Sequence, residues 1–169
     1  VPPYWPDEDV VKSDMLDYAF ETEWFDKHLG LMLNILERRG ELENTLVIVT
    51  SDNGCPFPRV KGQMYDDDFR LPFAAMWPAH IKPGGVTNSL CSFIDLAPTF
   101  YELAGIPADE SLPGKSLTDI FQTLENPVRN RAFMGRERHD MGRENDAGYP
   151  VRCIRTPQYL YVRNFEPDR

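Results

Sequence analysis

The sequence has few cysteines, no long apolar run and no excess of positive charge. Three cysteines in 169 residues are too few and too widely spaced for a disulfide scaffold or a zinc ribbon. No apolar stretch approaches the ~18 residues that a membrane helix needs, so we expect no membrane span. The net charge of −9 argues against a nucleic-acid-binding module and means that an anionic ligand needs a local positive site. The chain also starts without Met or a leader-like segment, so we expect it to be a piece of a longer protein.

The apolar pattern that is present predicts an α/β fold. Apolar residues at spacings of three, four and seven predict a long helix that ends before Gly40 and packs on a sheet, with Asp7, Asp9 or Ser13 as its N-cap. Residues 46–49 form a mostly β-branched run without polar alternation, which is typical of a strand buried on both faces of a parallel sheet. Further elements are expected as a strand over 73–77, a helix from Asp95 to Gly105, a helix over 117–124, and a hairpin or meander of 151–156 with 158–162. We assign 1–127 to the α/β core and 128–169 to a small antiparallel C-terminal part.

The stretch that carries the most chemical information is Asp52-Asn53-Gly54, directly after the first predicted strand. Ligand sites in parallel sheets gather at the carboxyl ends of strands. A carboxylate and an amide oxygen suit Ca²⁺ or Mg²⁺, and a glycine allows a tight turn. The same residue types also form ordinary turns, and these residues by themselves leave both interpretations open.

Two further groups of polar residues are candidates for ligand contact. Arg59 and Lys61 follow the Asp-Asn pair and suit a sulfate or phosphate, with solvated surface charge as the alternative. The acidic run 66–68 is interpreted as a solvated turn. Residues 135–148 have no apolar periodicity and are predicted as a loop, in which Arg138 and His139 are candidates for contact with sugar sulfates or carboxylates.

Several ordered motifs together resemble the second half of the type I, formylglycine-dependent sulfatases. They span essentially the whole chain and are Asn44 through Gly54, Lys61, Arg70-Leu71-Pro72-Phe73, Trp77-Pro78, Phe93 through Thr99, Ala104 through Pro107, and Pro113 through Leu117. The sequence of residues 56–61 and that of the tail from Arg138 through Tyr161 resemble the heparan N-sulfatase (N-sulfoglucosamine sulfohydrolase) branch.

The resemblance implies an alkaline-phosphatase-like fold and hydrolysis of sulfate esters or sulfamates on sulfated sugars such as N-sulfoglucosamine. It implies that Asp52 and Asn53 are ligands of Ca²⁺, with Mg²⁺ as the alternative, and that Lys61 is the catalytic lysine that contacts the sulfate. Arg70 matches an arginine that supports the site. The resemblance also implies a secreted or periplasmic protein, or a lysosomal one in a eukaryote.

Other parts of the sulfatase machinery are missing from this sequence. The early Asp pair, the catalytic histidine and the Cys or Ser that becomes formylglycine are not found, and Cys55 is rejected as the nucleophile because Phe57 stands where Pro or Ala belongs. We therefore expect a C-terminal fragment that is inactive alone and, with exposed sheet edges, self-associates.

Two alternatives to a sulfatase stay open. The first is a phosphonate monoester hydrolase or phosphodiesterase of the same superfamily, which also uses Asp-Asn metal sites. The second is a non-catalytic carbohydrate-binding relative.

Overall fold

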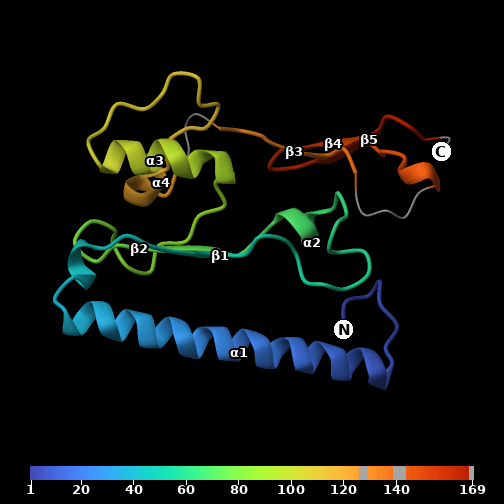
Figure 1. The fold of residues 1–169 in the computed structure, drawn as a ribbon, viewed down its shortest axis with the longest axis horizontal. Coiled ribbons are helices and arrows are strands. Elements are labelled where there is room, and N and C mark those ends of the chain that lie inside the picture. The colour runs from blue at the N-terminus through green and yellow to red at the C-terminus, as the bar shows by residue number, and fades with distance from the viewer. Residues whose placement is uncertain (126–128, 139–143, 168–169) are drawn as a thin grey trace. The chain divides into compact units, whose positions relative to one another are not determined.

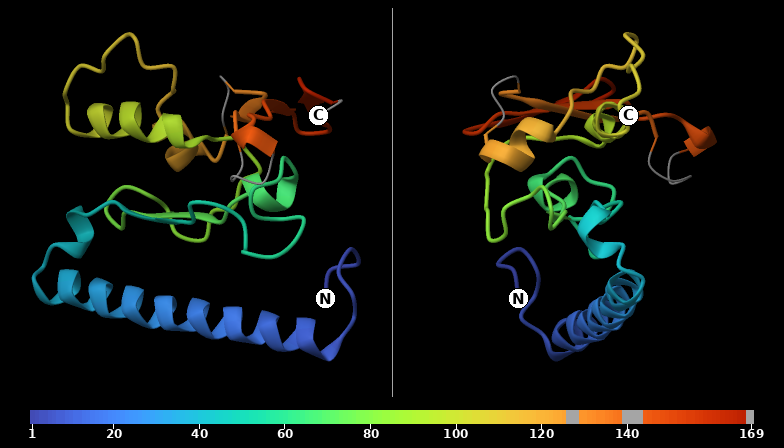
Figure 2. Two further views of the ribbon diagram at one scale, coloured as in Figure 1. Left: turned by 45° about the vertical axis from the view of Figure 1, so that its right-hand side comes forward. Right: turned by 90° about the vertical axis from the view of Figure 1, so that its left-hand side faces the viewer.

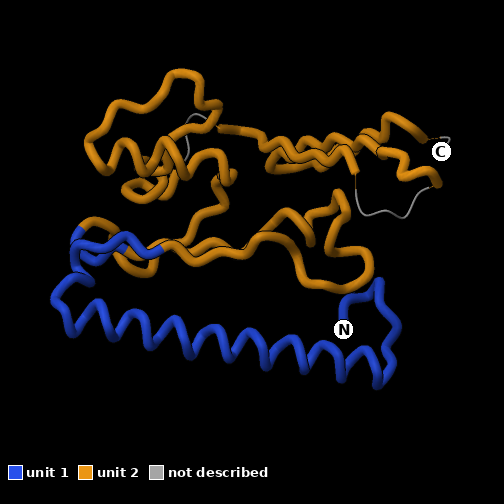
Figure 3. Tube along the Cα trace, in the orientation of Figure 1, with its two compact units in different colours: residues 1–47, 77–79 blue, residues 48–76, 80–169 orange. Residues whose placement is uncertain are grey.

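The computed structural model describes residues 1–125, 129–138 and 144–167 (Figure 1). The chain divides into two compact units, one of residues 1–47 with 77–79 and one of 48–76 with 80–169 (Figure 3).

The first unit is built around one long helix, α1 (Asp9–Arg38), followed by a 3₁₀ turn, η1 (Leu42–Asn44). The helix begins after Glu8, whose side chain makes no capping hydrogen bond, so the predicted caps at Asp7, Asp9 and Ser13 are wrong. Its end follows the prediction. Gly40 takes a φ of 71°, its N–H donates to Glu37 O, and the next N–H donates to Leu36 O, which is the two-bond pattern of a Schellman C-terminus.

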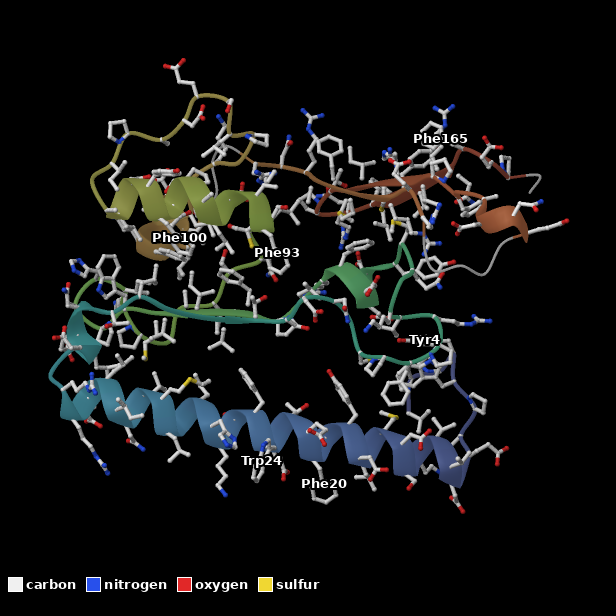
Figure 4. All side chains as sticks on the ribbon, viewed as in Figure 1. Tyr4, Phe20, Trp24, Phe93, Phe100 and Phe165 are labelled. Atoms are coloured by element: carbon white, nitrogen blue, oxygen red, sulfur yellow. The ribbon has the colours of Figure 1, made fainter. Side chains whose placement is uncertain are left out.

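No residue of α1 is buried. Phe20 and Trp24 lie one turn apart on a common side of the helix and are 66% and 59% exposed (Figure 4). A stripe of half-buried residues runs along another face, at positions Val11, Met15, Leu29, Leu33 and Leu36. This stripe has the predicted helical periodicity, whereas the predicted packing of α1 on a sheet remains a prediction.

Two short strands, β1 (Val47–Thr50) and β2 (Phe73–Met76), are hydrogen-bonded neighbours. Both agree with the predicted strands to within one residue. The expectation that β1 is buried on both faces is wrong for the described residues, because all four of its residues are half-buried. A sheet of two strands supplies too few neighbours to cover both faces.

The helical part of the second unit contains α3 (Leu96–Leu103) and α4 (Thr118–Thr123), preceded by the 3₁₀ turn η2 (Phe93–Asp95). Both helices confirm the prediction, and Gly105 follows α3 with a φ of 66°. Asp95 is the predicted cap of α3, but its side chain makes no capping hydrogen bond to that helix. It forms a buried polar centre instead. Its carboxylate, 0% exposed, accepts from the N–H groups of Ser92 and Lys115, each at 2.8 Å, and pairs with Arg129.

The rest of the second unit is a three-stranded antiparallel sheet in the order β3-β4-β5, formed by β3 (Ala132–Arg136), β4 (Val151–Arg155) and β5 (Leu160–Asn164) (Figure 2). Cys153 of β4 pairs with Met134 on one side and Val162 on the other. The β4–β5 hairpin confirms the prediction. β3 was missed, because its first three residues are a short apolar run and its last two fall in the polar stretch predicted as a loop, which also contains the 3₁₀ turn η3 (Glu144–Asp146).

One face of this sheet carries a small apolar core within the second unit. Val151 and Cys153, 1% and 3% exposed, pack with Met64, which belongs to the segment between β1 and β2. Phe69, Met134, Tyr149, Leu160 and Val162 pack around them. The core therefore joins the C-terminal sheet to the segment that follows the Asp52-Asn53 loop.

Candidate functional site

The loop that follows β1 presents two oxygen donors on a short, internally hydrogen-bonded turn. The Ser51 hydroxyl donates to Asn53 O at 2.6 Å, and the Asn53 N–H donates to Asp52 Oδ1 at 3.0 Å. The Asn53 amide nitrogen donates to Gly54 O at 2.8 Å, which leaves Asn53 Oδ1 as the acceptor end of that amide. Asp52 is exposed and Asn53 is half-buried. The loop thus holds a carboxylate and an amide oxygen at the carboxyl end of a strand, as predicted.

Gly54 fixes the other end of this loop against the helix α2 (Asp66–Phe69). Its N–H donates to Asp68 Oδ1 at 3.0 Å. A Cβ at Gly54 would lie 2.5 Å from Val60 Cγ1 and 2.8 Å from Asp68 Cα, and also against Asp67 O, so no side chain fits there. Glycine is required here by close packing rather than by an unusual φ angle.

The acidic residues of α2 are not the solvated turn that was predicted. Asp68 is only 5% exposed. Asp66 accepts from Arg155 Nε at 2.8 and 3.2 Å, and their side chains are 39% and 23% exposed. Sequence reasoning missed both because three consecutive acids carry no pattern that shows which one turns inward.

Lys61 lies in the segment that packs on the Asp52-Asn53 loop. Val60, 1% exposed, is the residue whose side chain contacts Gly54, and Lys61 follows it with an exposed side chain. Arg59 before it is exposed and takes a φ of 67°. The contact of Val60 with Gly54 therefore places the backbone that carries Arg59 and Lys61 next to the loop, while both cationic side chains are exposed.

Cys55, which follows Gly54, has the properties of a protonated thiol. Burial is the main cause that raises its pKa, and the nearby carboxylates of Asp67 and Asp68 raise it further, against hydrogen bonds to Phe57 and to its own backbone that lower it. The thiolate is the nucleophilic form of cysteine, so a raised pKa weakens Cys55 as a nucleophile.

The predicted substrate contacts in the C-terminal part are only partly described. Arg138 donates from Nη1 to Asp146 Oδ2 at 2.8 Å and from Nη2 to Asp146 O at 3.2 Å, with both side chains about half exposed. This pair joins the residue two positions after β3 to the 3₁₀ turn η3. His139 lies outside the described residues.

The donor set of the loop fits a hard divalent cation in part. Ca²⁺ takes about six to eight oxygen ligands, of which Asp52 and Asn53 would supply two kinds that it favours. Within 1–125, 129–138 and 144–167, no group of three or more His, Cys, Asp and Glu side chains is arranged to hold a metal. Asp52 and Asn53 by themselves thus supply only part of the oxygen ligands that Ca²⁺ takes.

Models of two protein families match the chain. The sulfatase family matches residues 2–106, and the family described as N-sulphoglucosamine sulphohydrolase, C-terminal, matches residues 60–167. The α/β architecture and the loop at the end of β1 agree with these matches. The chain therefore belongs to the sulfatase family. Within that family, its C-terminal part belongs with the N-sulphoglucosamine sulphohydrolase type.

Individual relatives support the same assignment. An ulvan-active sulfatase from Formosa agariphila is 30% identical over 169 residues, covering 100% of this chain and 27% of the relative. The human N-sulphoglucosamine sulphohydrolase is 28% identical, covering 97% of this chain and 34% of the relative. The chain thus spans about a quarter to a third of the length of these relatives.

Two solved structures share the fold. One, BT4656 in complex with its substrate D-glucosamine-2-N,6-O-disulfate, has a TM-score of 0.67 and 26% identity and covers 85% of this chain and 32% of its own. The other, a phosphonate monoester hydrolase from Silicibacter pomeroyi, also has a TM-score of 0.67, with 25% identity, and covers 82% of this chain and 30% of its own. The fold is alkaline-phosphatase-like α/β, as the resemblance implied.

Proposed function

We propose that this chain is part of a hydrolase that removes sulfate from a sulfated sugar, as an ester or a sulfamate. The observation that carries the proposal is the Asp52-Asn53 loop, held at the end of β1 next to the segment of Lys61, in a chain of the sulfatase family. N-sulfoglucosamine is the substrate we favour, because the C-terminal part matches the N-sulphoglucosamine sulphohydrolase type.

In this proposal Asp52 and Asn53 bind Ca²⁺, with Mg²⁺ as the alternative. The bound ion would supply positive charge that polarises the sulfuryl group. Lys61, as the catalytic lysine, contributes a second positive charge that stabilises negative charge developing on the sulfuryl oxygens and the leaving atom. Such a local cation is needed because the chain as a whole carries a net charge of −9 and repels anions.

The remaining parts of the proposal concern substrate, nucleophile and location. Arg138 and His139 contact the sugar, and the nucleophile is a formylglycine supplied outside residues 1–169, which by themselves are inactive and self-associate. We place the boundary between the core and the C-terminal part at residues 127 and 128.

The protein is secreted or periplasmic, or lysosomal in a eukaryote. Within the part of the chain that the structure describes, no helix is long and apolar enough to cross a membrane.

A second candidate function is hydrolysis of a phosphonate or phosphate ester. It is supported by the likeness to the phosphonate monoester hydrolase, whose TM-score equals that of the glucosamine disulfate complex. The same loop and lysine would serve it, because a phosphoryl group is also a tetrahedral anion.

Turnover by the full-length protein tests the proposal and separates the two candidates. We expect sulfate release from N-sulfoglucosamine in the presence of Ca²⁺, its loss on chelation, and its recovery when Ca²⁺ is added back. Lys61→Met should lower kcat by about 10²–10³-fold, the typical cost of removing one group that stabilises transition-state charge. Lys82→Met is the matched control, because Lys82 is an exposed lysine outside the loop. Faster turnover of a phenyl phosphonate than of any sulfated sugar would favour the second candidate, and full activity of Lys61→Met would contradict both.

A further inference from the structure

The Asp52-Asn53 loop contacts the acidic helix α2 through a hydrogen bond and a close packing contact. Gly54 N–H donates to Asp68 Oδ1 at 3.0 Å, and Gly54 leaves no space for a Cβ against Val60 and Asp68. The bond spans 14 residues of sequence, so it sets the position of the loop relative to α2 rather than the shape of either segment alone.

Asp68 is placed to act on the loop and not as a surface charge. Its residue is 5% exposed, although a lone carboxylate is among the groups that proteins bury least often. A buried carboxylate needs hydrogen-bond donors, and the backbone N–H of Gly54 is one of them. The donor belongs to the residue that directly follows the two proposed metal ligands.

The helix that carries Asp68 is itself attached to the C-terminal sheet. Asp66, two residues earlier, accepts from Arg155 Nε of β4 at 2.8 and 3.2 Å. Met64, just before α2, packs with Val151 and Cys153 of the same strand. The loop, α2 and β4 are therefore linked in series by one backbone-to-carboxylate bond, one ion pair and one apolar cluster.

We infer that Asp68 is a positioning residue for the metal-binding loop, acting through the Gly54 N–H and not as a ligand. The inference rests on the proposed function, because it assigns to Asp68 a role toward the cation that Asp52 and Asn53 bind. Groups that orient metal ligands through hydrogen bonds typically change metal affinity by about 10–100-fold when they are removed. Because only the acceptor oxygen matters in this role, an amide at position 68 should serve nearly as well as a carboxylate.

Calcium titration of the full-length protein tests the inference with a readout that does not depend on turnover. We expect Asp68→Ala to raise the Kd for Ca²⁺ by about tenfold or more, and Asp68→Asn to stay within about threefold of the unchanged protein. Asp67→Ala is the matched control, since it removes one exposed carboxylate from the same helix and leaves the Gly54 contact in place. If the Asp68 carboxylate mattered only for stability, Asp68→Ala would lower the melting temperature measured without Ca²⁺ and leave the Kd for Ca²⁺ unchanged.

The variants also separate failure of the inference from failure of the proposed function. Unchanged Ca²⁺ affinity in Asp68→Ala, together with lost binding in Asp52→Ala, would overturn the role of Asp68 and keep the metal site. Unchanged affinity in Asp52→Ala would overturn the metal site itself. If Asp68→Ala does not fold, Asp68→Glu replaces it. That variant keeps the charge but moves the acceptor by one methylene, so we expect weaker Ca²⁺ binding, and unaltered binding would contradict the inference.

Discussion

At the scale of single residues, Cys55 lies close to the proposed metal ligands in sequence but has a weakly reactive thiol. It lies two residues after Asn53 in sequence, but burial and the carboxylates of Asp67 and Asp68 raise its pKa. At neutral pH the side chain is therefore a thiol. In the proposed site, Asp52 and Asn53 bind the cation and Lys61 binds the sulfate, and Cys55 has no catalytic role.

The raised pKa of Cys55 predicts slow alkylation in the folded protein. Peptide mapping after iodoacetamide treatment at pH 8 should show Cys55 modified more slowly than in the unfolded chain, with a rate that keeps rising above the ordinary pKa of cysteine. Because the folded state holds this proton more tightly, its contribution to stability is present at neutral pH and is lost as the pH rises through the raised pKa. Faster alkylation at pH 7 than in the unfolded chain would mean a lowered pKa and would restore Cys55 as a candidate nucleophile.

The individual site residues differ in how far sequence could identify them. Asp52 and Asn53 are predicted at the carboxyl end of the first strand, and the structure places them on that loop. Their role as metal ligands is implied by the resemblance to sulfatases and stays a prediction. Asp68 was assigned to a solvated turn, although it is 5% exposed. Its partner is a backbone N–H 14 residues away, and a backbone donor leaves no trace in the sequence.

At the scale of elements, the contact between α2 and β4 attaches the loop region to the C-terminal sheet. The Arg155–Asp66 pair is partly exposed, so solvent screens it, and we expect it to contribute about 0.5–1 kcal/mol. The apolar cluster of Met64, Val151 and Cys153 supplies the larger part of the attachment. The ion pair therefore mainly fixes the orientation of α2.

Removal of this ion pair should loosen α2 more than it lowers global stability. Arg155→Met keeps most of the aliphatic stem, so we expect a loss of about 1 kcal/mol or less in the free energy of unfolding. We also expect faster amide hydrogen exchange at the N–H groups of Asp68, Phe69 and Gly54, measured by mass spectrometry. Arg131→Met, at an exposed arginine just before β3, should change neither. Unaltered exchange at these amides in Arg155→Met would show that the apolar cluster alone holds the helix.

Elements with a clear apolar periodicity or clear turn residues in the sequence were predictable. An element that depends on pairing with a distant strand was not. The periodicity and Gly40 defined α1 and its end, and the turn residues around Pro157 defined the β4–β5 hairpin. β3 was missed because two of its five residues are glycine and arginine, and pairing with β4 makes it a strand. The start of α1 at Asp9 lies where it was predicted, but its N-cap residue is Glu8, which makes no side-chain capping hydrogen bond and so carries no sequence signal.

At the scale of the whole molecule, the chain carries part of a sulfatase. It spans about a quarter to a third of the length of these relatives, and the activity that we propose needs groups outside residues 1–169. Many large apolar side chains are exposed, and on α1 they include Phe20 and Trp24. These surfaces support the expectation that residues 1–169 alone associate with one another.

The location of the cation tests the central claim most directly. Crystals of the full-length protein grown with Ca²⁺ should show an anomalous difference peak about 2.3–2.6 Å from a carboxylate oxygen of Asp52 and from Asn53 Oδ1, with Lys61 facing the same space. A calcium ion bound at another place, with both of these oxygens directed away from it, would contradict the account.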